Sequence, residues 1–160
     1  MTSMETRWLD EDERETWVRF VAVVELLPGV LDAQLRRDSG LTHYEYFTLA
    51  MLSEAPDGIL RMTSLAARTN ATLPRLSHVV RKLEDRGLVH RSPCPEDRRA
   101  TNAQLTEAGW EVVKAAAPGH VSAVREHVID PLTREQLTQL RAVSEAILER
   151  IDPDGPFAAP

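Results

Sequence analysis

Two helical patterns separated by a two-residue turn constrain the fold of this chain most strongly. The first covers residues 64–69, after Thr63, and the second runs from Thr72 to Arg86. Both threonines belong to the residue types that cap helix N-termini, and a glycine follows Arg86 where the second helix should end. Apolar residues recur at helical spacing in the second pattern: Leu76, Val79, Val80 and Leu83. A short helix, a brief turn and a longer helix with one apolar face form a helix-turn-helix.

Two short extended patterns follow, at residues 89–92 and 100–105. The loop between them reads Pro-Cys-Pro-Glu-Asp-Arg-Arg, which is rich in turn-forming and charged residues. These segments predict a β-hairpin with a charged tip, and such a hairpin directly after a helix-turn-helix is a wing. Residues 59–62 could pair as a further small strand.

Amphipathic helices are predicted on both sides of this central part. Upstream, residues 10–37 have one helical pattern, in which the Pro-Gly pair at 28–29 predicts a kink or a break into two helices. Thr42 and Glu45 have the spacing of a capping box at the start of a second helix, which should end at Ser53.

Downstream, helical patterns cover residues 106–127 and 133–151, and residues 152–160 contain three prolines and one glycine. We predict that this last segment is a disordered tail. The predicted fold is therefore mainly α with a small β wing, a winged helix-turn-helix between long N- and C-terminal helices.

The net charge of the chain, −6, argues at first against a nucleic-acid partner. The charge is unevenly spread, however, with −7 on residues 1–60, +4 on residues 61–114 and −3 on residues 115–160. Most cations of the middle segment are arginines, which make bidentate contacts to phosphate and guanine. A basic middle between acidic ends favours a binding face on a separate scaffold, although a solvated helix face is the alternative.

Composition and motifs exclude several other classes. No apolar run reaches the ~18 residues of a membrane helix, and residues 1–12 are too acidic and polar for a signal peptide. A single cysteine excludes an internal disulfide framework and a thiolate-based zinc site. Gly-x-Ser-x-Gly, phosphate-loop, His-Glu-x-x-His and nucleotide-binding motifs do not occur in the sequence. We therefore expect no enzymatic activity, no cofactor and no metal.

Three spaced motifs together carry a family resemblance. They are Leu-Glu-Asp-Arg-Gly-Leu-Val at 83–89, Pro-Glu-Asp-Arg-Arg-Ala at 95–100 and Leu-Thr-Glu-Ala-Gly at 105–109. This arrangement resembles the wing signature of the MarR family of bacterial transcriptional regulators, and the order of elements agrees over roughly residues 10–151. Two departures are Ala103, where a valine-like residue is usual, and Pro74, which lies early in the recognition helix and can alter base contacts.

The resemblance implies a cytoplasmic, nucleoid-associated homodimer in a bacterium. In this family the first helix and the last two helices of each chain interlock, and a winged helix-turn-helix lobe lies below them. The segments predicted for this chain are an N-terminal dimerisation helix (1–40), the DNA-binding lobe (41–109), C-terminal dimerisation helices (110–151) and the tail (152–160). Apolar residues offered for the interface, with an intrachain core as the alternative, are Trp17, Val21, Val24, Leu132, Leu137, Leu140, Val143, Ile147 and Leu148.

DNA contacts are predicted on the polar face of the second helix and on the wing. Arg75 is expected to bind guanine O6 and N7, with Ser77 and His78 on bases or phosphates. Asp97 is expected to hold one of two wing arginines in place while the other enters the minor groove. The predicted DNA-binding set is Arg68, Thr72, Pro74, Arg75, Ser77, His78, Arg81, Asp97, Arg98 and Arg99. These residues predict a sequence-specific binder of double-stranded DNA. The resemblance and the two-fold dimer it implies point to a transcriptional regulator, a repressor acting on a pseudo-palindromic operator.

The resemblance also implies release from DNA by a small aromatic or lipophilic ligand. That ligand would bind between the dimerisation scaffold and the DNA-binding lobe. Arg61 is the candidate for fixing a carboxylate, since it is a cation among apolar residues. The candidate ligand-binding residues are Trp17, Phe20, His43, Tyr44, Phe47, Met51, Arg61 and Met62, and core or surface positions are the alternative for each.

Three further interpretations compete with this one. Cys94 could make the regulator redox-responsive, although it is expected to be a single exposed thiol without a partner. A metal could bind acidic and histidine side chains, but these show no His pair at i,i+4 spacing: His43, Glu45, His120, Glu126 and His127. A winged helix can also serve as a protein–protein interaction module instead of binding DNA.

Overall fold

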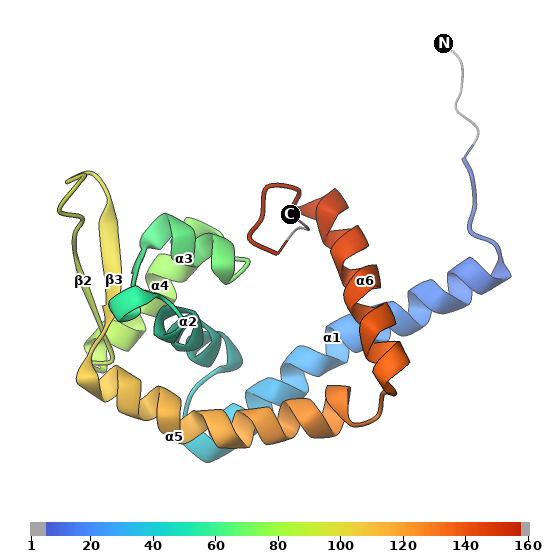
Figure 1. The fold of residues 1–160 in the computed structure, drawn as a ribbon, viewed down its shortest axis with the longest axis horizontal. Helices are drawn as coiled ribbons and strands as arrows, with labels where there is room; N and C mark the ends of the chain where they lie inside the picture. Colours follow the sequence, from blue (N-terminus) through green and yellow to red (C-terminus); the bar gives the residue numbers. More distant parts are fainter. Residues whose placement is uncertain (1–5, 158–160) are drawn as a thin grey trace, which may run out of the picture.

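A mostly helical fold with one small sheet is seen in the computed structural model, which describes residues 6–157 (Figure 1). The elements are α1 (Glu11–Ser39), α2 (His43–Ser53), the 3-10 turn η1 (Pro56–Gly58), β1 (Ile59–Arg61), α3 (Met62–Arg68), α4 (Leu73–Asp85), β2 (Val89–Pro93), β3 (Thr101–Leu105), α5 (Glu107–Val124), the π-helical turn η2 (Arg125–Ile129) and α6 (Arg134–Ile151). This is the predicted winged helix with long terminal helices. No helix in the described range is both long and apolar enough to cross a membrane.

Helix α1 begins and ends where its sequence predicts. Asp10 and Glu13 form a capping box at its start, and Gly40, with φ of +65°, ends it in a left-handed conformation. Of the two alternatives predicted at the Pro-Gly pair, a kink or a break, the break is wrong, because one continuous helix passes through Pro28. A proline removes a single N–H donor, and packing of the following turns, where Leu31 and Leu35 are buried, stabilises the helix on its far side.

The helix-turn-helix is formed by α3 and α4. The prediction that Thr63 caps α3 is wrong, since α3 begins at Met62 with Arg61 at the N-cap and no side-chain cap. Pairing of β1 with β3 extends to Arg61, so the chain turns directly from strand to helix. Helix α4 begins as predicted, with the Thr72 hydroxyl accepting from the Arg75 N–H at 3.4 Å and a proline in the first turn.

The sheet has the antiparallel order β1-β3-β2. Ala103 of β3 lies opposite Leu60 on one side and Arg91 on the other, so the segment offered as a small strand joins the wing. Gly109, the last residue of the third motif, is required here because a side chain at this position would overlap the Leu88 carbonyl oxygen. That close approach joins the start of α5 to the base of the wing.

The core lies within the lobe, where α2, α3, α4 and the sheet meet. Its fully buried side chains include Leu49, Leu65, Leu76, Val80 and Leu83, which confirms the apolar face predicted for α4. Val79, the fourth apolar residue of that face, is partly buried against the same cluster. The polar face of α4 is thereby turned outward.

The terminal helices behave differently from the lobe. Helices α1 and α5 pack against each other, whereas α6 folds back after the π-helical turn and buries no residue (Figure 1). Large apolar side chains remain exposed on α1 and α6, among them Trp17 at 55% and Val143 at 53%. Residues 152–157 form turns, and the rest of the predicted tail, 158–160, lies outside the described residues.

A histidine pair lies between α2 and α5. The His43 and His120 rings are 6.0 Å apart, and the His120 ring is 4.6 Å from that of Tyr46. Burial lowers the pKa of both histidines, and for His43 this outweighs the attraction of the nearby Asp32 carboxylate. Both are therefore neutral in the folded protein over more of the pH range than in the unfolded chain.

Stability should fall as the pH drops through this range. In the unfolded chain the two histidines have a pKa near 6.5, so below that pH the unfolded chain binds protons more readily than the folded protein does. Their contribution to the free energy of unfolding is therefore complete above about pH 6.5 and is lost as the pH falls toward the lower pKa of the folded state. His120→Phe is expected to flatten the dependence of the melting temperature on pH between 5 and about 7. His90→Phe, on the exposed side of β2, is the control. Equal slopes in both variants and the wild type would contradict this account.

Candidate nucleic-acid interface

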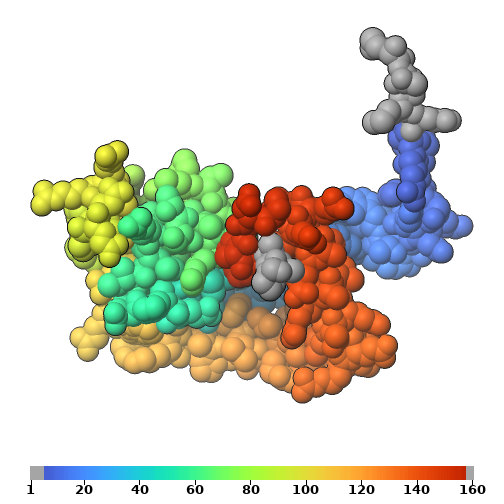
Figure 2. Space-filling model, turned by 45° about the horizontal axis from the view of Figure 1, so that its top comes forward, coloured from blue at the N-terminus to red at the C-terminus, as the bar shows by residue number. Residues whose placement is uncertain are grey.

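The predicted DNA-contacting residues occupy one end of the molecule. Figure 2 shows the wing, in yellow, protruding there beside the green surface of α3 and α4. The side chains of Arg75, His78 and Arg81 are exposed on α4, whereas Ser77 is half-buried. Thr72 and Pro74 are exposed at the start of the same helix, and Arg68 is half-buried at the end of α3. The structure thus brings the helix residues and the wing together on a common surface.

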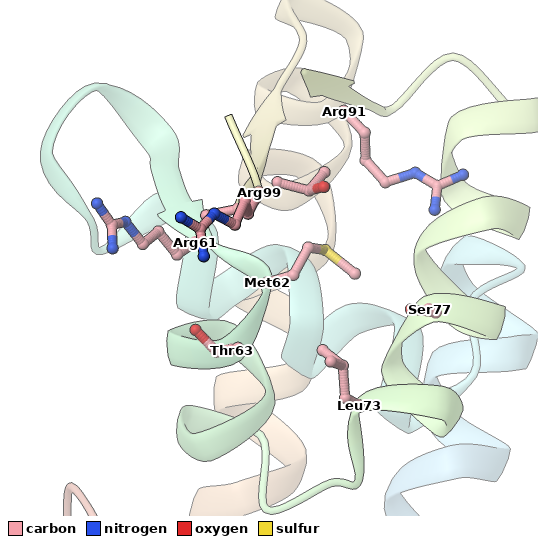
Figure 3. Close-up of a pocket in the computed structure, with 9 residues that line it drawn as sticks. Arg61, Met62, Thr63, Leu73, Ser77, Arg91 and Arg99 are labelled. Atoms are coloured by element: carbon pink, nitrogen blue, oxygen red, sulfur yellow. The ribbon is translucent and has the colours of Figure 1, made fainter. Parts of the chain in front are cut away.

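A basic cleft of about 200 Å³ lies between the starts of α3 and α4 and the wing (Figure 3). Three arginines line it, and they come from different elements: Arg61, Arg91 and Arg99. In Figure 3 the Arg91 side chain extends toward α4, and Met62 lies at the centre of the cleft. Arg91 is paired with Glu84 and Arg61 lies beside Glu96, so Arg99 is the arginine of this cleft that keeps no carboxylate partner within the described residues and favours an anion such as phosphate.

Glu84 fixes the wing relative to α4. Its carboxylate accepts three hydrogen bonds from Arg91, from the backbone N–H at 3.1 Å, from Nε at 3.0 Å and from Nη2 at 2.8 Å. The guanidinium first, and then the backbone N–H, hold the pKa of Glu84 below its usual range. Sequence reasoning did not identify this pair as functional. The pair could have been predicted from one sequence pattern: a glutamate in the last turn of the recognition helix is followed shortly by a strand that carries an arginine.

At the wing tip, Asp97 contacts Arg99 through the backbone. Its carboxylate accepts from the backbone N–H of Arg99 at 3.1 Å, and its carbonyl accepts from the Ala100 N–H at 2.9 Å. Within residues 6–157 it forms no ion pair with Arg98 or Arg99, so it holds Arg99 through the backbone and not through the guanidinium. Asp97 thereby shapes the loop backbone. Arg98 and Arg99 are both exposed, and Arg99 also lines the basic cleft.

Cys94 is buried, with 3% of its surface exposed, which corrects the expectation of an exposed thiol. The loop folds back, so that the Cys94 N–H donates to the Ala100 carbonyl at 2.8 Å. The nearby backbone N–H groups of Glu96 and Asp97, with a smaller contribution from Arg61, lower the pKa of the thiol.

The predicted ligand-binding residues do not form one pocket within the described chain. Trp17 and Phe20 line an open apolar groove of about 590 Å³ between α1 and α6. His43 and Phe47 stack with ring centres 6.2 Å apart beside α5, and Met51 packs against the core. Two further candidates, Arg61 and Met62, lie near the wing and line the basic cleft. Trp17 and Phe20 lie apart from the other candidates because α1 extends away from the lobe (Figure 1).

Two of these candidates have partners of their own. The Arg61 guanidinium lies 3.5 Å from the Glu96 carboxylate in the wing loop. Tyr44 lies beneath the guanidinium of Arg75. In the described part of the chain no three histidine, cysteine, aspartate or glutamate side chains are grouped closely enough to hold a metal ion.

Comparisons with known proteins agree with this geometry. A family model described as "MarR family" matches residues 41–101. The HTH-type transcriptional regulator MT0903.1 of Mycobacterium tuberculosis is 30% identical over 103 residues, which are 64% of this chain and 71% of that protein.

Two solved structures from Streptomyces coelicolor are similar over nearly the whole chain. One is Sco3205, a MarR family transcriptional regulator crystallised in complex with DNA, with 43% identity, a TM-score of 0.90 and coverage of 95% of both chains. The other is AbsC, a MarR family transcriptional regulator, with 39% identity, a TM-score of 0.88, and coverage of 93% of this chain and 100% of that one.

Proposed function

Because this chain belongs to the MarR family of DNA-binding transcriptional regulators, we propose that it is a homodimeric repressor of a pseudo-palindromic operator, released by a small apolar or aromatic ligand. One observation carries the proposal. The cations of an otherwise acidic chain gather on α4, around the basic cleft and on the wing, where a DNA duplex would lie.

Each part of this surface has its own role. The N-terminal half of α4 enters the major groove, where Arg75 contacts a guanine and His78 a base or phosphate. Arg68 and Arg81 contact phosphates, which position the protein without reading sequence. A wing arginine enters a narrow minor groove, and the Glu84–Arg91 pair keeps the wing at a fixed angle to α4.

The exposed apolar side chains of the terminal helices support the homodimer. No residue of helix α6 is fully buried within its own chain, and its exposed apolar side chains (Leu140, Val143 and Ile147) need cover from another surface. A two-fold axis through such an interface presents two α4 helices to one face of the DNA. Half-sites about one helical turn apart, ~34–36 Å, fit that arrangement.

Release from DNA by a ligand requires a ligand site whose shape differs between the DNA-bound form of the protein and the form that has left DNA. The apolar groove beside Trp17 and Phe20 is also lined by Val143 and Ile147, so it lies at the edge of the proposed dimer interface. An aromatic or lipophilic compound bound there would act on the helices that set the spacing of the two lobes. A compound that binds the released form more tightly lowers the affinity for DNA by that ratio of affinities.

A mobility-shift titration over salt concentration tests the proposal. With contacts to ~6–10 phosphates, affinity for DNA next to the protein's own gene should fall ~10³–10⁵-fold between 50 and 200 mM salt. A flat titration would contradict electrostatic binding. No shifted DNA at low salt would instead favour the protein–protein interaction module.

A further inference from the structure

Tyr44 connects the recognition helix to the two helices beside it. The Arg75 guanidinium carbon lies 4.5 Å above the centre of the Tyr44 ring. The Tyr44 hydroxyl is 3.1 Å from the Thr69 hydroxyl, which donates to the Leu65 carbonyl at 2.8 Å. Thr69 is buried, with 3% of its surface exposed, so the ring is fixed at its far end. A chain of contacts thus runs from the end of α3 through α2 to the first turn of α4.

This contact restricts a side chain that would otherwise move freely. Arginine has several rotatable bonds, and an exposed one loses much rotational freedom when it binds a partner. Stacking on an aromatic ring occupies only the flat face of the guanidinium. The N–H donors lie in its plane, at the edges, and stay available. A guanidinium held in this way is preorganised for a bidentate contact with guanine O6 and N7.

We propose that Tyr44 is a positioning residue that holds Arg75 for base readout, and thereby sets the base preference of the protein at one position in each half-site. This inference rests on the proposed DNA-binding function. It assigns Tyr44 to specificity, whereas the sequence suggested a ligand contact.

The first measurement uses the free protein. A ring current should shift the NMR signals of the Arg75 side-chain protons upfield in the wild type and in Tyr44→Phe, and Tyr44→Leu should remove the shift. Tyr44→Phe keeps the ring and loses only the hydroxyl, so it separates stacking from the contact with Thr69. Absence of the shift in the wild type would overturn the inference without any reference to DNA.

The second measurement determines the base preference of DNA binding. The wild type selects its duplex from a random library, and affinities are then measured for every single-base substitution. Arg75→Ala should remove a preference of about 5- to 150-fold at one position per half-site. Tyr44→Leu should lower the preference at that same position about two- to fivefold, and Tyr44→Phe should restore it. The double variant should be no less specific than Arg75→Ala alone.

The outcomes separate this inference from the function on which it rests. If the wild type selects no duplex, the proposed function fails and the inference falls with it. If the wild type selects a duplex but Tyr44→Leu keeps the full preference, or weakens binding to all sequences equally, only the inference fails. Melting temperatures of the variants show whether a uniform loss comes from reduced folding.

Discussion

The double variant Val143→Glu/Ile147→Glu is expected to be monomeric and to lose at least ~100-fold in affinity for its operator. Both side chains lie on the exposed apolar side of α6, beside Trp17 and Phe20. Glutamate is a good helix former and neither position is buried within the chain, so the fold of the chain should persist. In the proposed dimer, however, unpaired carboxylates would be buried at the interface, which costs several kcal/mol.

The loss of DNA affinity follows from the loss of bivalency. A dimer binds its second half-site at a high effective concentration, which raises its affinity ~10²–10⁴-fold over that of one lobe. Light scattering after size exclusion should give about 17.9 kDa for the variant and about twice that mass for the wild type.

Thr138→Glu/Ala142→Glu is the matched control for this variant. It adds the same two charges, at the same spacing, on another side of α6. The control should remain dimeric and keep its affinity for DNA. A dimeric Val143→Glu/Ile147→Glu protein would show that this side of α6 is not in the interface.

The second large effect is expected at the wing, where Arg98→Ala/Arg99→Ala should abolish specific binding and leave the dimer intact. Both guanidinium groups are exposed without an acidic partner in the described range, so they are available to DNA. Each arginine contact is worth ~1–3 kcal/mol, and a dimer carries two wings. Specific affinity should therefore fall by at least ~100-fold, and the single variants identify which arginine enters the minor groove.

Arg134→Ala/Arg141→Ala separates this local effect from net charge. These arginines lie on α6 and their removal changes the charge of the chain by the same amount. Competition binding at fixed salt should give near wild-type affinity for this control. An equal loss in both double variants would mean that only total charge matters.

Local rules predicted the elements of the fold well. Thr42 with Glu45 and Thr133 with Gln136 form the capping boxes that their spacing predicts, since caps depend only on residues within one turn. The errors arose where contacts distant in sequence decide the outcome. Helix α1 continues through Pro28 because later turns pack, and strand pairing up to Arg61 moves the start of α3 ahead of Thr63.

The sequence predicted which helix or loop carries each residue of the candidate site, but not which side chains contact each other there. Periodicity and capping placed Arg75 on the exposed side of α4, and the motif placed both arginines at the wing tip. Neither could show that Tyr44, on another helix, lies against Arg75, or that the loop folds over Cys94. Pairs such as Glu84 and Arg91 need three-dimensional placement, since spacing alone does not fix which side chains meet.

The central claim, that this chain binds operator DNA as a two-fold dimer, is tested most directly by footprinting. Fragments of the source genome captured by the purified protein are digested with a nuclease in its presence. The account predicts protected stretches that contain an inverted repeat, with half-site centres about one helical turn, 10–10.5 bp, apart. Protection of unrelated single sites, or no protection at low salt, would contradict it.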